Sequence, residues 1–513
     1  MQEKYGIIDI GSNTMRLVIY RHEKIGGFKE IENIKSVARL RNYLNEENCL
    51  NESGIKILLN TLKYFAEITT FHAVTTIKVV ATATIRHAKN QQEILREIRA
   101  HTNLNVRILS DYEEAYYGYL AVVNSTSLTE GITIDIGGGS TEVTYFKDRK
   151  LIYYHSFPFG VLTLRQQFMA EAIPTVEELL ELQAYLIKEI STVNWLKDKK
   201  IPIIGIGGSA RNIAQIDQRS KLYPLGGLHQ YKMNGTDLIN VKNSLTGLSL
   251  AELKRMEGLS EDRADIIFPA LEVFHVMYQV TNASAFILSR KGLREGVFFE
   301  ELLKPIGIKM FPDVIEESLF EIEYEYGIHT NNVIQVSRIA VTILRLLQKM
   351  GFHCITAAHL REAKRAALLF QLGRYIDDEG SSQHTFYVLA NRTIDGLMHR
   401  ERLRLAAIAS YKSKTILKQY LEPFKEWISK DELNVIKILG AVLRFAYALN
   451  ETKRNIVEGI EITEEGENLI IDIICINNWQ AERYQAEKQK KHLEKALKRD
   501  IILHFTCREA THP

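Results

Sequence analysis

Hydrophobic residues recur at two spacings along the chain, and the spacing changes from region to region. Between about residues 5 and 300, short runs rich in Ile and Val alternate with segments such as 52–71, whose apolar residues recur at helical spacing. This alternation predicts α/β structure. From about Lys304 the patterns of long amphipathic helices dominate, and strand-like runs return after residue 456. We therefore predict an α/β region, a helical region and a small α/β region, in that order.

The segment 133–141, with the sequence Thr-Ile-Asp-Ile-Gly-Gly-Gly-Ser-Thr, joins a strand-like run to a glycine turn. Asp135 lies between two isoleucines, and a carboxylate in an apolar strand is costly unless a cation pairs with it. The three glycines that follow allow the backbone to approach a ligand closely. Taken alone, the segment is equally typical of a tight hairpin. The same Ile-Asp-Ile-Gly core surrounds Asp9, and this recurrence predicts two similar halves.

A third strand, glycine turn and helix are predicted at residues 201–214, where Gly205 stands in place of the aspartate. This turn offers an anion the backbone N–H groups of a helix N-terminus, but no carboxylate. Arg86, Arg211 and Arg294 follow strand ends or glycine turns, so each is a candidate to clamp phosphate through two parallel hydrogen bonds. For Arg86 the alternative is an exposed position in the first turn of a helix.

Two adjacent glutamates open a helix that follows the strand at 106–109. Ser110 and Glu113 have the spacing of a capping box, in which the Glu113 side chain returns to the Ser110 backbone. Glu114 is turned by about 100° around the helix and is not used by that box. Glutamates at a helix start are usually solvated charges favoured by the helix dipole. Glu114 is nevertheless available for chemistry.

Composition narrows the classes of function. The chain has 513 residues and a formal net charge of +2, so an anion site must be local and bulk binding of nucleic acid is not expected. The four cysteines are scattered, which argues against a zinc site or a disulfide framework. We find neither a signal-peptide pattern nor an apolar run of about 18 residues, and therefore expect a soluble, cytoplasmic protein without a membrane span.

Carboxylates beside glycine turns favour phosphoryl-transfer chemistry. Oxygen ligands suit Mg²⁺, with Mn²⁺ as an alternative and K⁺ as a further candidate ion. Positioning and charge neutralisation supply most of the catalysis in such reactions, and a glutamate near the metal can deprotonate water. A P-loop signature is absent from the sequence. On physical grounds alone, an ATP-dependent kinase or ATPase remains open.

Six motifs in order resemble the exopolyphosphatase and guanosine pentaphosphate phosphatase family, within the actin, sugar-kinase and Hsp70 superfamily. The resemblance implies two duplicated ribonuclease-H-like (actin-like ATPase) domains at 1–124 and 125–303. An all-α HD-like domain at 304–455 and a small α/β C-terminal domain at 456–513 would follow. The motifs are Asp9-Ile-Gly-Ser-Asn13, Ala81-Thr-Ala-Thr-Ile-Arg86, Ser110-Asp-Tyr-Glu-Glu-Ala115, Asp135-Ile-Gly-Gly-Gly-Ser140, Gly207-Gly-Ser-Ala-Arg211 and Gly292-Leu-Arg-Glu-Gly296.

The resemblance also implies an activity and roles for particular residues. The leading hypothesis is an exopolyphosphatase that hydrolyses the terminal phosphate of inorganic polyphosphate processively, with Glu114 activating water. The alternatives are a guanosine pentaphosphate 5′-phosphohydrolase and a sensor of guanosine tetra- or pentaphosphate with weak activity. Asp135 and Asp9 are the predicted metal ligands. The predicted phosphate-binding residues are Asn13, Arg86, Gly137, Gly138, Ser140, Gly208 and Ser209.

The helical region departs from the metal-binding pattern of HD domains. Phe370 and Gln371 occupy the place of the His-Asp pair, Asn332 that of the upstream histidine, and only His384 remains. We therefore predict no metal in this region. Its expected roles, by the same resemblance, are to lengthen the polyanion channel and to form the contact of a homodimer.

Overall fold

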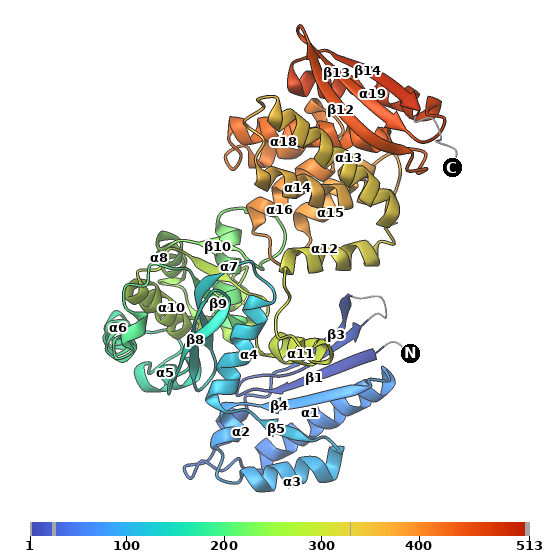
Figure 1. Cartoon of the computed structure of the whole chain (residues 1–513). Helices are drawn as coiled ribbons and strands as arrows, with labels where there is room; N and C mark the ends of the chain where they lie inside the picture. Colours follow the sequence, from blue (N-terminus) through green and yellow to red (C-terminus); the bar gives the residue numbers. More distant parts are fainter. Residues whose placement is uncertain (1–2, 23–26, 329, 508–513) are drawn as a thin grey trace. The chain divides into compact units, whose positions relative to one another are not determined.

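The computed structural model describes residues 3–22, 27–328 and 330–507 (Figure 1). The chain forms two compact units. The first unit comprises residues 1–223 and 228–314, and the second comprises residues 224–227 and 315–513. Each unit is described by itself below.

The first half of the first unit is built on a five-stranded sheet in the order β3-β2-β1-β4-β5. β1 pairs antiparallel with β2 and parallel with β4. Helices α1 and α3 lie side by side against the sheet, and their apolar faces complete its core through residues such as Leu62, Phe65 and Ile94 (Figure 1). The strands are β1 (Glu3–Ile10), β2 (Met15–His22), β3 (Phe28–Ser36), β4 (Thr76–Ala81) and β5 (Val106–Ile108); the helices are α1 (Glu52–Phe71), α2 (Ala83–His87) and α3 (Gln91–Thr102).

The second half has a six-stranded sheet in the order β10-β11-β9-β6-β7-β8. β6 pairs antiparallel with β7 and parallel with β9, and helices α5 to α10 contribute to its core. The strands are β6 (Glu130–Ile136), β7 (Thr141–Lys147), β8 (Lys150–Phe157), β9 (Ile203–Ile206), β10 (Lys232–Met233) and β11 (Phe286–Leu288); the helices are α5 (Val161–Phe168), α6 (Val176–Ser191), α7 (Gly207–Ser220), α8 (Gly235–Leu245), α9 (Leu250–Arg255) and α10 (Ile267–Thr281).

The two sheets repeat one another, as the recurring Ile-Asp-Ile-Gly core predicted. In each, a central strand carries the aspartate, forms a hairpin with the next strand and pairs in parallel with a later one. Asp9 is opposite Arg16 in its hairpin, and Asp135 is opposite Glu142. The predicted strands of both halves are present, whereas β3 and β10 were not predicted.

Helices α4 (Asp111–Val123) and α11 (Leu293–Leu303) connect the two halves. α4 packs on the second sheet and on α11, and α11 packs on β1. Two aromatic rings join α11 to the first sheet, because Phe298 stacks on Tyr20 with ring centroids 4.0 Å apart. The helices approach closely where Gly296 lies against the backbone of Tyr117. This close packing fixes the N-terminal turns of both helices, which carry Glu114 and Arg294.

The second unit is helical and ends in a small α/β layer, as predicted. β12, β13 and β14 form a three-stranded sheet in that order, and α19 packs on α18. The assignment of the helices to an HD-like domain and the bounds of the four predicted domains remain predictions. The elements are α12 (Val314–Glu325), α13 (Thr330–Lys349), α14 (Ala357–Leu368), α15 (Ser381–Asn391), α16 (His399–Ala409), α17 (Lys414–Leu421), α18 (Lys430–Ala448), β12 (Val457–Glu465), β13 (Asn468–Cys475), α19 (Gln480–Leu497) and β14 (Ile501–Cys507).

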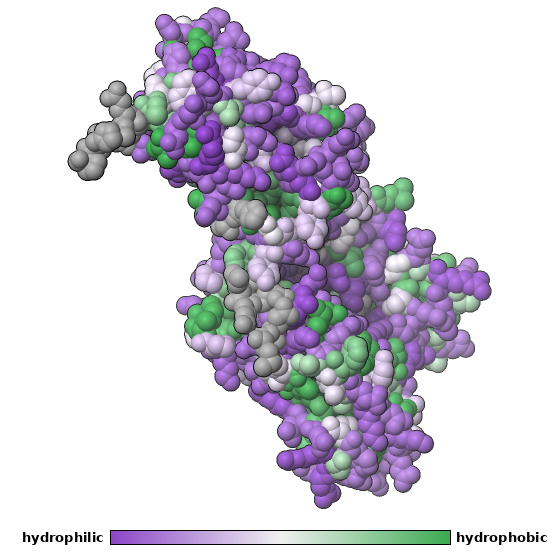
Figure 2. All heavy atoms as spheres, turned by 90° about the vertical axis from the view of Figure 1, so that its right-hand side faces the viewer, coloured by the Kyte–Doolittle hydropathy of each residue, from purple (hydrophilic) through white to green (hydrophobic). Residues whose placement is uncertain are grey.

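In the described part of the chain, no helix is both long enough and apolar enough to cross a membrane. The face shown in Figure 2 is largely hydrophilic, with hydrophobic residues in small groups.

The contact between α4 and α11 can be tested with two glycines of this helix pair. A Cβ at position 296 would overlap the Tyr117 backbone, so Gly296→Ala should lower the free energy of unfolding by about 1–3 kcal/mol, as overpacking typically does. Gly118→Ala is the control, because its Cβ would meet only the Ile206 side chain at 3.5 Å. Alanine there should be neutral or stabilise by about 0.5–1 kcal/mol. Equal denaturant midpoints for the two variants would contradict the close packing.

Candidate functional site

A cavity of about 440 Å³ lies between the two halves of the first unit. The turns after β1 and β6 line it, together with Glu114 in the first turn of α4 and the N-terminal turns of α7 and α11. Each of these segments lies at the carboxyl end of a strand or at the start of a helix. Such positions offer unpaired backbone N–H groups and the positive end of a helix dipole, which suits an anionic ligand.

Four carboxylates line this cavity: Asp9, Glu114, Asp135 and Glu142. Burial raises the pKa of Glu114 to about 7, with the charges of Asp135 and Asp9 adding to the effect and Arg86 opposing it. Burial and the charge of Asp9 raise the pKa of Asp135 to about 6. Burial and the charge of Glu114 raise the pKa of Glu142 well above its ordinary value. The four acids thus repel one another in a dry site, and a bound cation would relieve that repulsion.

The first turn of α4 separates the roles of its two glutamates. The capping box predicted there is present, because Glu113 accepts a hydrogen bond from the Ser110 backbone N–H at 2.8 Å and the Ser110 hydroxyl accepts one from the Glu113 N–H at 3.2 Å. Glu114 points instead to the cavity. Its carboxylate accepts a hydrogen bond from Arg86 Nη1 at 2.9 Å, and that arginine also donates to the Leu109 carbonyl and pairs with Asp111. Arg86 is therefore a buried partner of Glu114, not an exposed residue.

Asp9, the counterpart of Asp135, has a cation beside it. Its carboxylate lies 2.9 Å from Arg294 Nη1, which reaches it from the start of α11. Burial raises the pKa of Asp9, while Arg294 and then Arg16 lower it. Asp135 forms no ion pair among the described residues. Of the two predicted metal ligands, Asp135 is therefore the one whose carboxylate lacks a protein cation bound to it.

Arginines also contribute to the lining of the same cavity. Arg16, Arg211, Arg263 and Arg290 line it in addition to Arg294. Burial, together with the charges of the other four arginines, lowers the pKa of Arg211 to about 10. In the described chain Arg211 has no ion-pair partner, and its buried Nε has no hydrogen-bond partner. A group of cations that line one cavity favours a ligand with several negative charges.

The glycine turn after β6 is held by the helix that follows β8. The N–H groups of Val161 and Leu162 donate to the carbonyls of Gly137 and Gly138, each at 3.0 Å. Gly160 permits this contact, because a Cβ there would lie 2.5–2.6 Å from the backbone of the turn. The carbonyls of the turn are thereby bound on the side of α5. The turn is a rigid support for a ligand in the cavity.

Two further features of the turns fit an anion site. Gly207 begins α7 with φ of +89°, and a Cβ there would lie 2.8 Å from Asp135 Oδ1. Only glycine allows the start of α7 to come so close to the aspartate. Neither amide atom of the buried Asn13 side chain has a hydrogen-bond partner within the described residues. An unpaired buried amide costs free energy, so Asn13 is positioned for a ligand that is not part of the protein.

The structure brings most of the predicted site residues together. Arg86 and Ser209 are the exceptions, because neither lines the cavity. Arg86 donates to Glu114, and Ser209 accepts a hydrogen bond from Arg263 Nη1 at 3.2 Å. Their predicted phosphate contacts remain predictions. The predicted residues that line the cavity are Asp9, Asn13, Glu114, Asp135, Gly137, Gly138, Ser140 and Gly208.

Sequence reasoning missed Glu142, Arg16 and Arg263. The first two could have been found by pairing the strands across each predicted hairpin, because Arg16 is opposite Asp9 and Glu142 is opposite Asp135. Arg263 lies in a short 3₁₀ turn, Glu261–Arg263, far from every glycine motif in the sequence. No local pattern marks it, and only the tertiary fold places it against Gly208.

The burial of Glu114 predicts a stability that depends on pH. In the folded protein the pKa of Glu114 is about 7, above its ordinary value of 4.5. Ionised Glu114 therefore lowers the free energy of unfolding by the full amount above pH 7, and by very little below pH 4.5, where the side chain is protonated in both states. Glu114→Gln should therefore raise the free energy of unfolding more at pH 8 than at pH 5. The difference between the two gains should be at most about 3 kcal/mol. Denaturant unfolding without divalent cations or phosphate measures this difference.

Glu113→Gln is the matched control for that measurement. Hydrogen bonds from Ser110 and Arg107 lower the pKa of Glu113 against the opposing effect of burial, so its charge stabilises the fold above its ordinary pKa. The variant should lose about 1 kcal/mol at pH 8. An equal gain for Glu114→Gln at both pH values would show that its carboxylate is not buried as described.

Comparison with known proteins agrees with this site. A model described as the Ppx/GppA phosphatase family matches residues 18–305, and one described as Ppx/GppA phosphatase, domain III, matches residues 314–495. The solved structure of the Aquifex aeolicus member of the Ppx/GppA protein family is 28% identical, with a TM-score of 0.53, over 60% of this chain and 99% of that chain. An exopolyphosphatase from Cytophaga hutchinsonii is 22% identical, with a TM-score of 0.55, over 58% of this chain and 98% of that chain, and shows likeness of fold. Because the first model spans more than half of the sequence, the protein belongs to the Ppx/GppA phosphatase family.

Proposed function

We propose that the protein is an exopolyphosphatase that removes the terminal phosphate of inorganic polyphosphate by attack of water. The observation that carries this proposal is that one cavity joins four buried carboxylates to five arginines. The arginines suit a chain of phosphates, and the carboxylates suit a cation and a proton acceptor at its end. The first unit would thus bind the substrate and cleave it in the same place.

Glu114 is the proposed general base. A base is most effective when its pKa is close to the working pH, and burial brings the pKa of Glu114 to about 7. Arg86 holds the carboxylate in place at 2.9 Å and lowers its pKa, so that a useful fraction is ionised at neutral pH. Arg86 would act through Glu114, as a positioning residue.

The proposed step balances as a hydrolysis. The oxygen of water forms a bond to the terminal phosphorus while the bond from that phosphorus to the bridging oxygen breaks. The proton of water goes to Glu114, and the electron pair of the broken bond stays on the shortened chain. Arg211 and Arg263 neutralise charge on the phosphates, and the N–H group of Gly138 orients the terminal one.

The residues present fit Mg²⁺ as the cation. Asp135 and Glu142 would hold it, since both are buried carboxylates whose pKa values are raised by burial and by neighbouring acids. No three His, Cys, Asp or Glu side chains of the described chain converge into a complete metal site. Phosphate oxygens and water would therefore supply the other ligands, as Mg²⁺ prefers. When bound, the ion would neutralise charge that develops on the phosphates.

Phosphate release from a panel of substrates tests the proposal. The protein would be incubated with long-chain polyphosphate, guanosine pentaphosphate and ATP, each with Mg²⁺ and with EDTA. We expect release from polyphosphate, with orthophosphate and long chains as the products seen on a gel if the enzyme is processive. Release from guanosine pentaphosphate alone would identify a 5′-phosphohydrolase instead, and release from ATP alone would overturn both readings.

Glu114→Gln tests the base. The variant should lose about 10²–10⁴-fold in kcat with little change in KM, because proton transfer occurs in the transition state. Glu113→Gln should keep nearly normal turnover, since Glu113 caps the helix. Equal losses in the two variants would refute this division of roles.

Arg86→Met separates positioning of the base from binding of phosphate. Because Arg86 lowers the pKa of Glu114, its removal should raise that pKa and shift the acidic limb of kcat/KM from about pH 7 to higher pH. Activity should then recover toward the wild-type value as the pH rises, with KM almost unchanged. A large rise in KM at every pH would instead assign Arg86 to the phosphate.

A further inference from the structure

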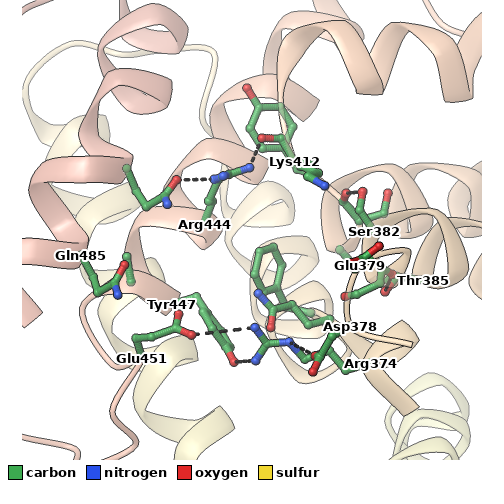
Figure 3. Close-up of a pocket in the computed structure, with 18 residues that line it drawn as sticks. Arg374, Asp378, Glu379, Ser382, Thr385, Lys412, Arg444, Tyr447, Glu451 and Gln485 are labelled. Carbon is green, nitrogen blue, oxygen red and sulfur yellow. Dashed lines mark hydrogen bonds and ion pairs between the residues drawn. The ribbon is translucent and has the colours of Figure 1, made fainter. Parts of the chain in front are cut away.

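The second unit has a polar pocket of about 280 Å³ that the proposed hydrolysis does not use. Its walls come from the segment after α14, the start of α15, the end of α16, the end of α18 and the middle of α19 (Figure 3). The volume is close to the lower limit of roughly 300 Å³ for small-molecule sites. Its size therefore suits a small metabolite.

One wall of this pocket carries positive charge without a counter-charge. Arg444 donates to Gln489 Oε1 at 2.7 Å and to the Lys412 carbonyl. Neither Arg444 nor Lys412 has an acidic ion-pair partner among the described residues. Burial, followed by the charge of Arg444, also lowers the pKa of the neighbouring His492 to about 4. This side of the pocket therefore favours an anionic ligand.

Polar groups of the pocket residues also lack partners. Ser410 is only 3% exposed, and its hydroxyl makes no hydrogen bond with any described residue. Gln371 Oε1 is likewise buried and unpaired in the described chain. An unpaired buried polar group costs free energy that a ligand's hydrogen bond would recover. Two such groups in the lining of one pocket indicate a binding site.

The opposite wall is aromatic and acidic. Phe370 and Tyr447 lie with ring centroids 5.4 Å apart, and Arg374 donates to the Tyr447 hydroxyl at 2.6 Å. Arg374 also pairs with Asp378 at 3.2 Å and Glu451 at 3.8 Å, so its charge is already neutralised (Figure 3). The aromatic rings suit a planar group, and the carboxylates suit hydroxyl or amino donors. The same carboxylates would repel a ligand with many phosphates.

We propose that this pocket binds a nucleoside monophosphate. The single phosphate would lie at Lys412, Arg444 and Ser410, and the base at Phe370 and Tyr447. The ribose hydroxyls or an exocyclic amine would donate to the acidic wall. This proposal does not depend on the reaction of the first unit.

Calorimetric titration of the full-length Glu114→Gln protein tests the pocket without hydrolysis of the probe. The probes are AMP, GMP, CMP and UMP, with the matching nucleosides, inorganic phosphate and tripolyphosphate as comparisons. We expect one site for at least one nucleoside monophosphate, with binding at least about tenfold weaker for its nucleoside and for inorganic phosphate. No binding of any monophosphate at millimolar concentration would overturn the proposal. Equally tight binding of tripolyphosphate at this site would also overturn it.

Variants in the same background locate the site. Lys412→Met should weaken binding about tenfold or more, whereas Lys418→Met, an exposed lysine on α17 that does not line the pocket, should leave it unchanged. Ser410→Ala should weaken binding without lowering the midpoint of unfolding of the free protein, because the hydroxyl has no protein partner to lose. Binding that Lys412→Met leaves unchanged would place the ligand elsewhere and refute the assignment.

Discussion

Four carboxylates lie at strand and helix ends that line one cavity. Keeping these acids close together is the constraint that the structure of the first unit has to meet. Ionised acids in a dry site are unfavourable, and the raised pKa values of Glu114 and Asp135 express that cost. The surrounding packing has to hold them there, and α4 and α11 do so through their close contact at Gly296. The site is therefore a place where stability is given up for reactivity.

The duplicated halves carry opposite charges at equivalent positions. Asp9 has Arg16 across its hairpin, whereas Asp135 has Glu142 across the matching hairpin. The residue opposite the aspartate is thus a cation in the first hairpin and an anion in the second, in the same register. With Arg294 already on Asp9, the two aspartates of a symmetric fold have different surroundings, which favours Asp135 over Asp9 in the proposed metal site.

Local sequence patterns predicted the features that depend on interactions between residues close together in the sequence. The hairpins at Asp9 and Asp135, the capping box of Ser110 and Glu113, and the resulting freedom of Glu114 all follow from neighbouring residues, and the structure has the hairpins and the box. Contacts over long sequence distances could not be predicted in this way. Arg86 meets Glu114 only because two strands and α4 converge, and its predicted contact with phosphate remains a prediction.

The two proposed anion sites differ in how their acidic side chains are paired with cations. In the first unit Asp9 and Glu114 each have an arginine bound, whereas Asp135 and Glu142 form no ion pair among the described residues, so a cation in the proposed site would neutralise these two together with the phosphates. In the pocket of the second unit, Asp378 and Glu451 already pair with Arg374, so Lys412 and Arg444 are the cations of this pocket that have no acidic partner among the described residues. Charge pairing within each site is thus the basis for the ligand proposed for it: a polyanion with a metal ion in the first, a single phosphate in the second.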